Sequence, residues 1–136
     1  MSRNYEVVVF GSSEQYSIHE ICEALDPKNM MIHGRFGREN TVLKDGKYIK
    51  DLSYMNRPIK EIVYVDYSDD MVTYHKDNAI LISKFDGDTS DRELVDLIPF
   101  LEYLAKTPND VRKEIKRFGG PEKASKNYHD QQMMKY

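Results

Sequence analysis

Short apolar blocks separated by polar ones run along this chain, and their spacing predicts alternating strands and helices. Residues 5–10, which contain the run VVVF, predict a fully buried strand. A helix is expected next, because Ser17 and Glu20 have the spacing of a capping box. It ends at Asp26-Pro27, because a residue before proline avoids the helical region. Its buried face is expected to hold Ile18, Ile21, Cys22 and Leu25, with Cys22 as a core thiol.

A β-hairpin has the clearest local signal in the chain. Asp45-Gly46 separates residues 41–44 from residues 47–50, and both flanks contain strand-forming side chains. Shorter apolar runs predict three further strands, at residues 30–36, 62–65 and 79–82. Strands therefore recur throughout the first 82 residues.

The second half of the chain is predicted to be helical. Ser90 and Glu93 repeat the capping-box spacing, and Pro99 is expected to kink or divide the helix that follows. The buried stripe of that helix is expected to contain Leu94, Leu97, Ile98, Leu101 and Leu104. Another helix should start at Pro108, with Val111, Ile115 and Phe118 on its apolar face. For the polar last 16 residues, 121–136, we expect a frayed helix or disorder.

This order of elements predicts an α/β fold with a mostly parallel sheet covered by helices. Ligands in such folds bind at the carboxyl ends of the strands. Residues 11–13 and 66–70 are polar segments at two predicted strand ends. Ser12 is a candidate phosphate contact or a plain turn residue, and Lys50 is a candidate anion partner or an exposed strand-end lysine. Asp66, Asp69 and Asp70 are candidate magnesium ligands or solvated aspartates.

Charge and composition narrow the function classes. The chain has 136 residues and a formal net charge of −3, and its length suits one small domain. Residues 61–102 hold eleven acidic and three basic side chains, a charge of −8 that argues against a nucleic-acid interface there. Three interpretations of this acidic segment stay open: a metal site, a contact with a cationic partner, or a solvated face. The single cysteine excludes an internal disulfide framework, and no apolar run approaches the length of a membrane span.

Several runs are specific enough to indicate a family. They are residues 44–53 with Asn56-Arg57, Asp77-Asn78-Ala79, Asp86-Gly87-Asp88, residues 97–105 and Asp110-Val111-Arg112. In this order they resemble the haloacid-dehalogenase-like domain shared by RNA polymerase II C-terminal-domain phosphatases and receptor subunits of the mitochondrial presequence translocase. The resemblance covers residues 5–118, and residues 45–53 and 98–105 are more similar to the receptor branch.

The resemblance also implies that catalytic groups are missing. The phosphatases carry Asp-x-Asp-x-Thr, whose aspartates are the nucleophile and the general acid, and these 136 residues contain no such run. Their threonine position corresponds to Gly11, and Tyr67 follows the metal-side Asp66. Lys50 matches their lysine motif, so Ser12, Lys50 and Asp66 would be vestigial. We therefore expect no catalysis and no cofactor, because phosphoryl transfer needs an activated nucleophile and a charge-neutralising metal.

The family places the motif-bearing strand at the centre of its sheet. Residues 1–118 are accordingly expected to be a partial domain with a β-hairpin insertion, in which the N-terminal central strand is missing, followed by a polar tail at residues 119–136. A fragment of a longer protein is one interpretation. A sheet that closes differently, or that pairs between chains, is the other.

The receptor branch implies a non-catalytic subunit of the mitochondrial inner-membrane presequence translocase. Its domain would face the intermembrane space and contact the membrane only through a segment outside this chain. Presequences are basic amphipathic helices, and an acidic surface suits them. The candidate presequence contacts are Asp66, Asp69, Asp70, Asp86 and Asp88. The candidate contact with the channel subunit is the hairpin tip, which consists of Lys44, Asp45, Gly46 and Lys47. The alternative is that the hairpin is only a structural addition to the fold.

Two other functions stay open at this point. One is a magnesium-dependent phosphoserine protein phosphatase of the polymerase C-terminal-domain type, with Asp66 as a metal ligand. The other is a scaffold that keeps only the fold, because fold does not fix function. Nucleic acid is not expected as a partner in any of these interpretations.

Overall fold

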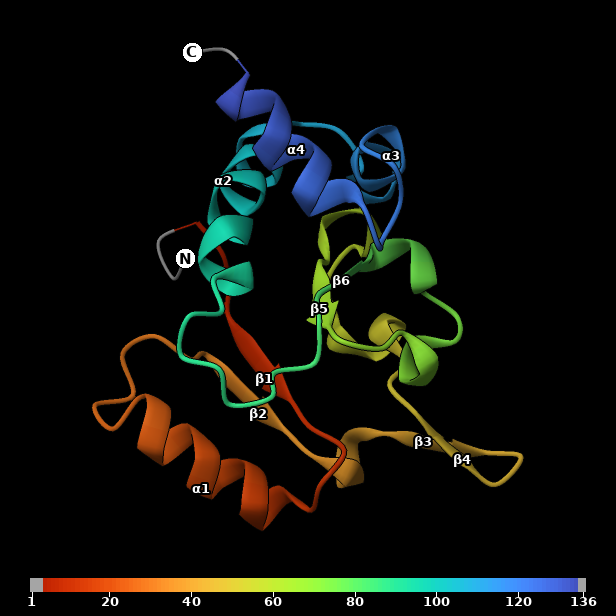
Figure 1. Cartoon of the computed structure of the whole chain (residues 1–136). Coiled ribbons are helices and arrows are strands. Elements are labelled where there is room, and N and C mark those ends of the chain that lie inside the picture. The colour runs from red at the N-terminus through yellow and green to blue at the C-terminus, as the bar shows by residue number, and fades with distance from the viewer. Residues whose placement is uncertain (1–3, 135–136) are drawn as a thin grey trace. The chain divides into compact units, whose positions relative to one another are not determined.

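A computed structural model describes residues 4–134 of the chain (Figure 1). The chain divides into two compact units, residues 1–50 and residues 51–136. Besides the helices and strands named below, the described residues form five short 3₁₀ helices: Arg38–Asn40, Leu52–Met55, Ile59–Glu61, Asp70–Val72 and Lys76–Asn78.

The first unit contains a strand, a helix and a second strand that runs parallel to the first. β1 (Val8–Phe10) pairs with β2 (Gly34–Phe36), and Val9 lies opposite Arg35. The connection between them is α1 (Gln15–Leu25), as expected for a parallel crossover. Both strands are only half-buried, so the prediction of a fully buried first strand is wrong.

The sequence signals for α1 were partly misleading. The helix begins at Gln15 with Glu14 as its N-cap, so Ser17 lies inside the helix and no capping box forms. Ile18 and Cys22 are buried, which confirms Cys22 as a core thiol. Ile21 and Leu25 are exposed, because the face that packs is narrower than the apolar spacing suggested.

The predicted β-hairpin is confirmed. β3 (Val42–Lys44) and β4 (Lys47–Ile49) are antiparallel, with Lys44 opposite Lys47. Asp45 and Gly46 have φ values of 52° and 77°, the left-handed values that a two-residue type I′ turn requires. Aspartate tolerates this conformation better than most residues, and glycine adopts it freely.

The second unit contains another parallel pair and three helices. β5 (Tyr64–Asp66) pairs with β6 (Ala79–Leu81) in parallel register. α2 (Glu93–Lys106), α3 (Val111–Arg117) and α4 (Ala124–Met133) follow. The main core joins β6 to all three helices through Ile80, Leu97, Phe100, Leu104, Ile115, Phe118 and Ala124. A smaller cluster contains Leu52, Tyr64, Val72 and Ala79.

Three predictions for these helices need correction. α2 has no capping box, because Ser90 bonds to Asp88 and the N-cap is Arg92. Pro99 lies within α2 and does not divide it. α3 begins at Val111 instead of Pro108, and Asp110 caps it by accepting a 2.9 Å hydrogen bond from the Arg112 amide.

The polar C-terminal stretch forms an ordered helix where a frayed one or disorder was expected. Ala124 at the start of α4 is fully buried. The ring of Tyr128 lies 5.3 Å from those of Phe100 and Phe118, and 5.2 Å from that of Tyr103, measured between centroids. This aromatic packing fixes α4 despite its polar sequence. The last two residues of the stretch lie outside the described residues.

The α/β class predicted from the sequence is confirmed. Among the described residues the predicted mostly parallel sheet is present as two separate parallel pairs, and the hairpin forms a third two-stranded sheet. The expected central strand before residue 5 stays a prediction. Within residues 4–134 we find no helix with the length and apolar character that a membrane span requires.

Candidate functional site

Two acidic loops meet at the carboxyl end of the β5–β6 pair. The amide of Ile82, just after β6, donates a 3.0 Å hydrogen bond to the carbonyl oxygen of Asp66 at the end of β5. The ammonium of Lys84 lies 5.3 Å from the centroid of the Tyr67 ring, which joins the two loops by a cation–π contact. The segments that begin at Asp66 and Ser83 therefore share one edge of the second unit.

Asp66 is held by its own strand. Its Oδ2 accepts a 2.7 Å hydrogen bond from the Tyr64 hydroxyl, and its Oδ1 accepts one of 2.7 Å from the Tyr67 amide. Burial raises the pKa of Tyr64, and the Asp66 carboxylate raises it further, so the phenol remains a donor at neutral pH. Both oxygens of Asp66 are thus oriented by the protein itself.

The other two candidates in this loop do not complete a metal site with Asp66. Asp69 lies 3.9 Å from the ammonium of Lys76, and the Asp70 amide bonds to the Ser68 hydroxyl at 3.1 Å. No three histidine, cysteine, aspartate or glutamate side chains within residues 4–134 are grouped to hold a metal. The side chain of Tyr67 supplies no carboxylate or amide oxygen beside Asp66. These residues do not fit a magnesium ion.

The second acidic loop presents its carboxylates to solvent. Asp86 accepts a hydrogen bond from the Asp88 amide at 3.0 Å, and Asp88 accepts from the amide and hydroxyl of Ser90 at 2.9 and 2.7 Å. The hydroxyl and amide of Ser90 lower the pKa of Asp88, which keeps it ionised. Asp86 and Asp88 are exposed and neither forms an ion pair in the described part of the chain, so their charge is available to a cation.

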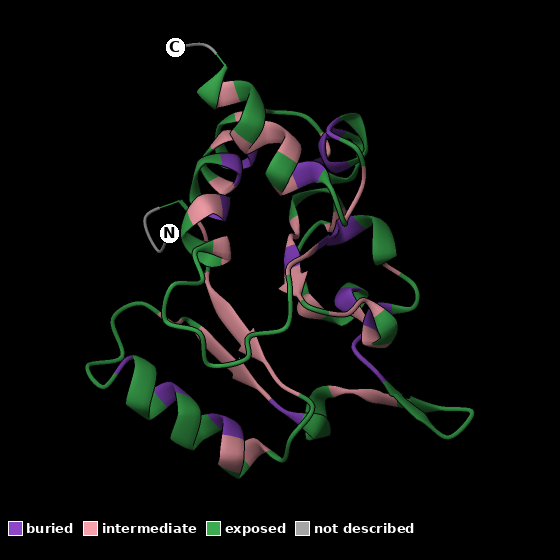
Figure 2. Ribbon diagram, in the orientation of Figure 1, coloured by how far each residue is buried: buried purple, intermediate pink, exposed green. Residues whose placement is uncertain are grey.

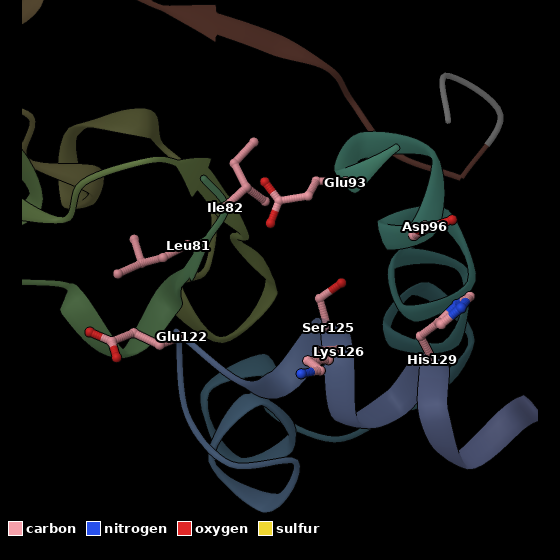
Figure 3. A pocket seen from close by; sticks show the side chains of 8 residues that line it. All are labelled: Leu81, Ile82, Glu93, Asp96, Glu122, Ser125, Lys126 and His129. Atoms are coloured by element: carbon pink, nitrogen blue, oxygen red, sulfur yellow. The ribbon is translucent and has the colours of Figure 1, made fainter. Parts of the chain in front are cut away.

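A pocket next to this edge was missed by the sequence analysis. It has a volume of about 180 Å³ and is lined by Leu81, Ile82, Glu93, Asp96, Glu122, Ser125, Lys126 and His129. Figure 3 shows the Glu93 carboxylate directed from the start of α2 toward Ile82. This carboxylate accepts a 2.6 Å hydrogen bond from the Ser83 amide, which is why Glu93 does not cap its own helix. The polar sequence of α4 concealed that it would contribute to a pocket.

The carboxyl end of β1 is built differently. The Lys50 ammonium donates a 2.8 Å hydrogen bond to the Phe10 carbonyl and lies 5.3 Å from the centroid of the Phe10 ring. Only 4% of Lys50 is exposed, so the interpretation as an exposed strand-end lysine is wrong. Ser12 is exposed, and its carbonyl oxygen accepts a hydrogen bond from Arg38 at 3.2 Å.

Gly11, the position of the family's threonine, has little room for a side chain. A Cβ atom built there would contact the Cδ1 atom of the buried Ile18. The Gly11 amide bonds to the Phe36 carbonyl at 3.0 Å, which continues the β1–β2 pairing. A threonine at this position would therefore displace Ile18 from the core of the first unit.

The hairpin tip is polar and exposed. Lys44, Asp45, Gly46 and Lys47 are all exposed, as the green end of the hairpin in Figure 2 shows. Leu43 and Tyr48 are also exposed and lie opposite each other across the two strands. The hairpin thus combines charged and apolar side chains in a form that suits a protein contact.

Comparison with known proteins identifies relatives for most of the chain. Residues 1–112 match the family model for NLI interacting factor-like phosphatases. A protein of Emericella nidulans named mitochondrial import inner membrane translocase subunit tim50 is 40% identical over 121 residues, which are 88% of this chain and 23% of that protein. The protein of the same name from Candida albicans is 42% identical over 113 residues, 82% of this chain and 24% of that protein. The chain thus spans about a quarter of the length of these curated relatives.

Proposed function

The chain belongs to the NLI interacting factor-like phosphatase family, and we propose that it is part of a non-catalytic subunit of the mitochondrial inner-membrane translocase. In this role it binds the basic presequences of imported proteins and contacts the channel subunit from the intermembrane space. The observation that carries the proposal is the identity of about 40% with proteins named as subunits of that translocase. The match extends over 88% of the chain.

The charge distribution supports presequence binding. The carboxylates of the β5–β6 edge are exposed in the loop that contains Asp86 and Asp88, and Lys84, two residues before Asp86, lies over the Tyr67 ring. A basic helix approaching this edge would be steered by negative potential. Weak, salt-dependent binding follows from such a surface, because exposed charges are screened within about 10 Å at 0.1 M salt.

The absence of catalysis is proposed on the residues at the family's motif positions. Lys50 bonds to a main-chain carbonyl, Asp66 is held by Tyr64 and Tyr67, and Gly11 replaces a hydroxyl-bearing residue. Gly11 and Lys50 supply no nucleophile for phosphoryl transfer, and both carboxylate oxygens of Asp66 already accept hydrogen bonds. The family model, which is named for phosphatases, favours the alternative of a magnesium-dependent phosphoserine phosphatase.

A binding assay tests the proposed function. The probe is a fluorescein-labelled peptide of roughly 18 residues, or five helical turns, with leucines on one face and arginines on the other. The matched control peptide has glutamate in place of each arginine. We expect the 136-residue chain to bind the basic peptide at low salt, to lose affinity between about 50 and 300 mM salt, and not to bind the acidic peptide. Equal binding of both peptides would contradict the proposal.

A phosphatase assay separates the two candidate functions. The chain is incubated with a phosphoserine peptide and magnesium, beside the Asp66→Asn variant. We expect no phosphate release above that of the variant. Release that requires magnesium and is lost in Asp66→Asn would favour the phosphatase instead.

The hairpin is proposed as the contact with the channel subunit. Its support is the exposed tip with Lys44 and Lys47, next to exposed Leu43 and Tyr48. A photo-crosslinking side chain at position 45 should capture the channel subunit in isolated mitochondria. The matched position 87 lies in an exposed loop with glycine at positive φ and should not capture it.

A further inference from the structure

Helix α2 is apolar on both of its faces, which is unusual for a helix at a protein surface. Its inner face, with Leu97, Phe100 and Leu104, is buried in the core of the second unit. Its outer face carries Leu94, Val95, Ile98 and Pro99, and all four are exposed. We call these four residues the outer strip. Figure 2 shows such exposed positions on α2 beside the buried ones.

The exposure of the outer strip is substantial. Leu94, Val95 and Ile98 are 62%, 50% and 38% exposed. Residues 94, 95, 98 and 99 are neighbours on one side of a helix with 3.6 residues per turn. A contiguous exposed apolar surface marks an interaction site, so the outer strip indicates a surface that is covered when the protein functions.

Carboxylates lie on both sides of the outer strip along the sequence. The loop that leads into α2 contains Asp86, Asp88 and Asp91. The Asp91 carboxylate accepts a hydrogen bond from the Glu93 amide at the start of the helix. Glu102 follows Ile98 by one turn and is exposed. We call Asp86, Asp88, Asp91 and Glu102 the acidic rim. The one basic residue in this stretch, Arg92, lies 3.6 Å from the Asp96 carboxylate, so the acidic rim keeps its charge.

Resting on the proposed function, we infer that the outer strip and the acidic rim together form the docking surface for a basic amphipathic helix. The apolar face of such a helix would cover Leu94, Val95 and Ile98, and its cationic side chains would reach the rim. In helix-in-groove recognition, apolar anchor residues of the helix provide affinity and charged residues set its orientation. Charge complementarity selects this occupant: a second copy of the chain would bring a second acidic rim against the first.

The α1 helix offers a matched control surface. Leu25 and Ile21 are 63% and 49% exposed, nearly equal to Leu94 and Val95 on α2. The α2 variant therefore carries Leu94→Gln and Val95→Gln, and the α1 variant carries Leu25→Gln and Ile21→Gln. Both pairs lie at exposed helix positions, so each variant should unfold at the temperature of the parent chain, which circular dichroism checks.

The experiment measures affinity for the labelled basic peptide described above, using the whole 136-residue chain. We expect the α2 variant to weaken binding at least tenfold, as the loss of two apolar contacts predicts, with an unchanged salt dependence. The α1 variant should bind within twofold of the parent chain. A rim variant with Asp88→Asn, Asp91→Asn and Glu102→Gln should lose affinity and also lose most of the salt dependence.

The outcomes separate this inference from the proposed function. If the basic peptide binds and the α2 and α1 variants bind equally well, the docking surface is wrong and the proposed function stands. If the parent chain does not prefer the basic peptide over its acidic counterpart, the proposed function fails. Sedimentation that shows a dimer, abolished in the α2 variant, would assign the outer strip to a second copy and overturn the inference.

Discussion

The carboxyl end of β1 and the carboxyl end of the β5–β6 pair occupy equivalent places in their parallel pairs, and they are used in different ways. At the β1 end, the ammonium of Lys50 bonds to the Phe10 carbonyl in a buried position. At the β5–β6 end, the loop with Asp86 and Asp88 keeps its carboxylates in solvent. The first end is closed by its own lysine, whereas the second is open to a partner.

A position at the end of a strand therefore does not by itself indicate a binding site. Both ends carry polar residues that sequence reasoning singles out, and both lie where α/β folds bind ligands. What separates them is whether the chain satisfies its own polar groups there. Phe10 receives its hydrogen bond from a buried charge, while the hydrogen bonds that Asp86, Asp88 and Asp91 accept within residues 4–134 come from nearby amides and a hydroxyl.

The largest expected effect is on the free energy of unfolding, when a lysine at each strand end is replaced by methionine. Lys50→Met should lower the free energy of unfolding by about 2–3 kcal/mol, because a hydrogen bond from a charged donor is lost in a buried place. The matched variant Lys84→Met, at the exposed end, should change it by less than about 0.5 kcal/mol. Urea unfolding followed by circular dichroism measures both. Similar losses in the two variants would contradict the distinction between a closed and an open end.

Glycines near the two ends give the next contrast. A Cβ atom at Gly37 would lie 2.9 Å from the Gln15 main chain and from the Ser13 carbonyl, none of which can move freely. Gly37→Ala should therefore cost about 1–3 kcal/mol. Gly87 in the exposed acidic loop has open space around it and a φ of +95°, so Gly87→Ala should cost about 1 kcal/mol from backbone strain alone. Thermal unfolding measures the loss of stability in both variants. A larger loss for Gly87→Ala than for Gly37→Ala would contradict this expectation.

A smaller effect is expected at Asp66. Tyr64→Phe removes the 2.7 Å hydrogen bond to its carboxylate and should cost about 1 kcal/mol of stability. Binding of the basic peptide should stay within twofold of the parent value, because Asp66 lies outside the acidic rim. A large loss of peptide binding in Tyr64→Phe with unchanged stability would indicate that the docking surface includes the loop after β5.

The smallest expected effect is a change in acid sensitivity. Backbone hydrogen bonds from Ile32 and Met31 lower the pKa of Asp26 below its ordinary 3.8, and a third comes from Met30. A lowered folded-state pKa adds stability that is complete above pH 4 and is lost as the pH falls through the lowered value. Asp26→Asn should therefore flatten the decline of the melting temperature below pH 4. Asp88→Asn, in the exposed loop, should flatten it less, and the reverse order would contradict this assignment.

Much of the fold was predictable because its signals are local. The Asp45-Gly46 turn and the core positions Val111 and Ile115 of α3 follow from turn chemistry and from apolar spacing over a few residues. The starts of α1 and α2 were not predictable in this way. Glu93 bonds to the amide of Ser83, ten residues away, and Glu14 precedes the spacing that suggested a cap at Ser17. Such contacts depend on tertiary packing.

The candidate site was predictable only in part, for the same reason. Sequence reasoning singled out Asp66 and the acidic loop as candidates, because a carboxylate directly after a strand is visible in the sequence. It placed Leu94 and Ile98 in a buried stripe, although both are exposed. Six of the nine residues 93–101 are large and apolar, which is more than one buried face of a helix accommodates. That excess was the signal for a second apolar face.

The central claim, that α2 and the acidic rim form the docking surface, is tested most directly by nuclear magnetic resonance. The ¹⁵N-labelled 136-residue chain is titrated with the unlabelled basic amphipathic peptide, and the shift of each backbone amide is followed. We predict that the largest shifts fall within residues 84–102, that they shrink as salt is added, and that residues 41–50 of the hairpin stay unchanged. Shifts concentrated on the hairpin or on α1, with residues 84–102 unaffected, would contradict the claim.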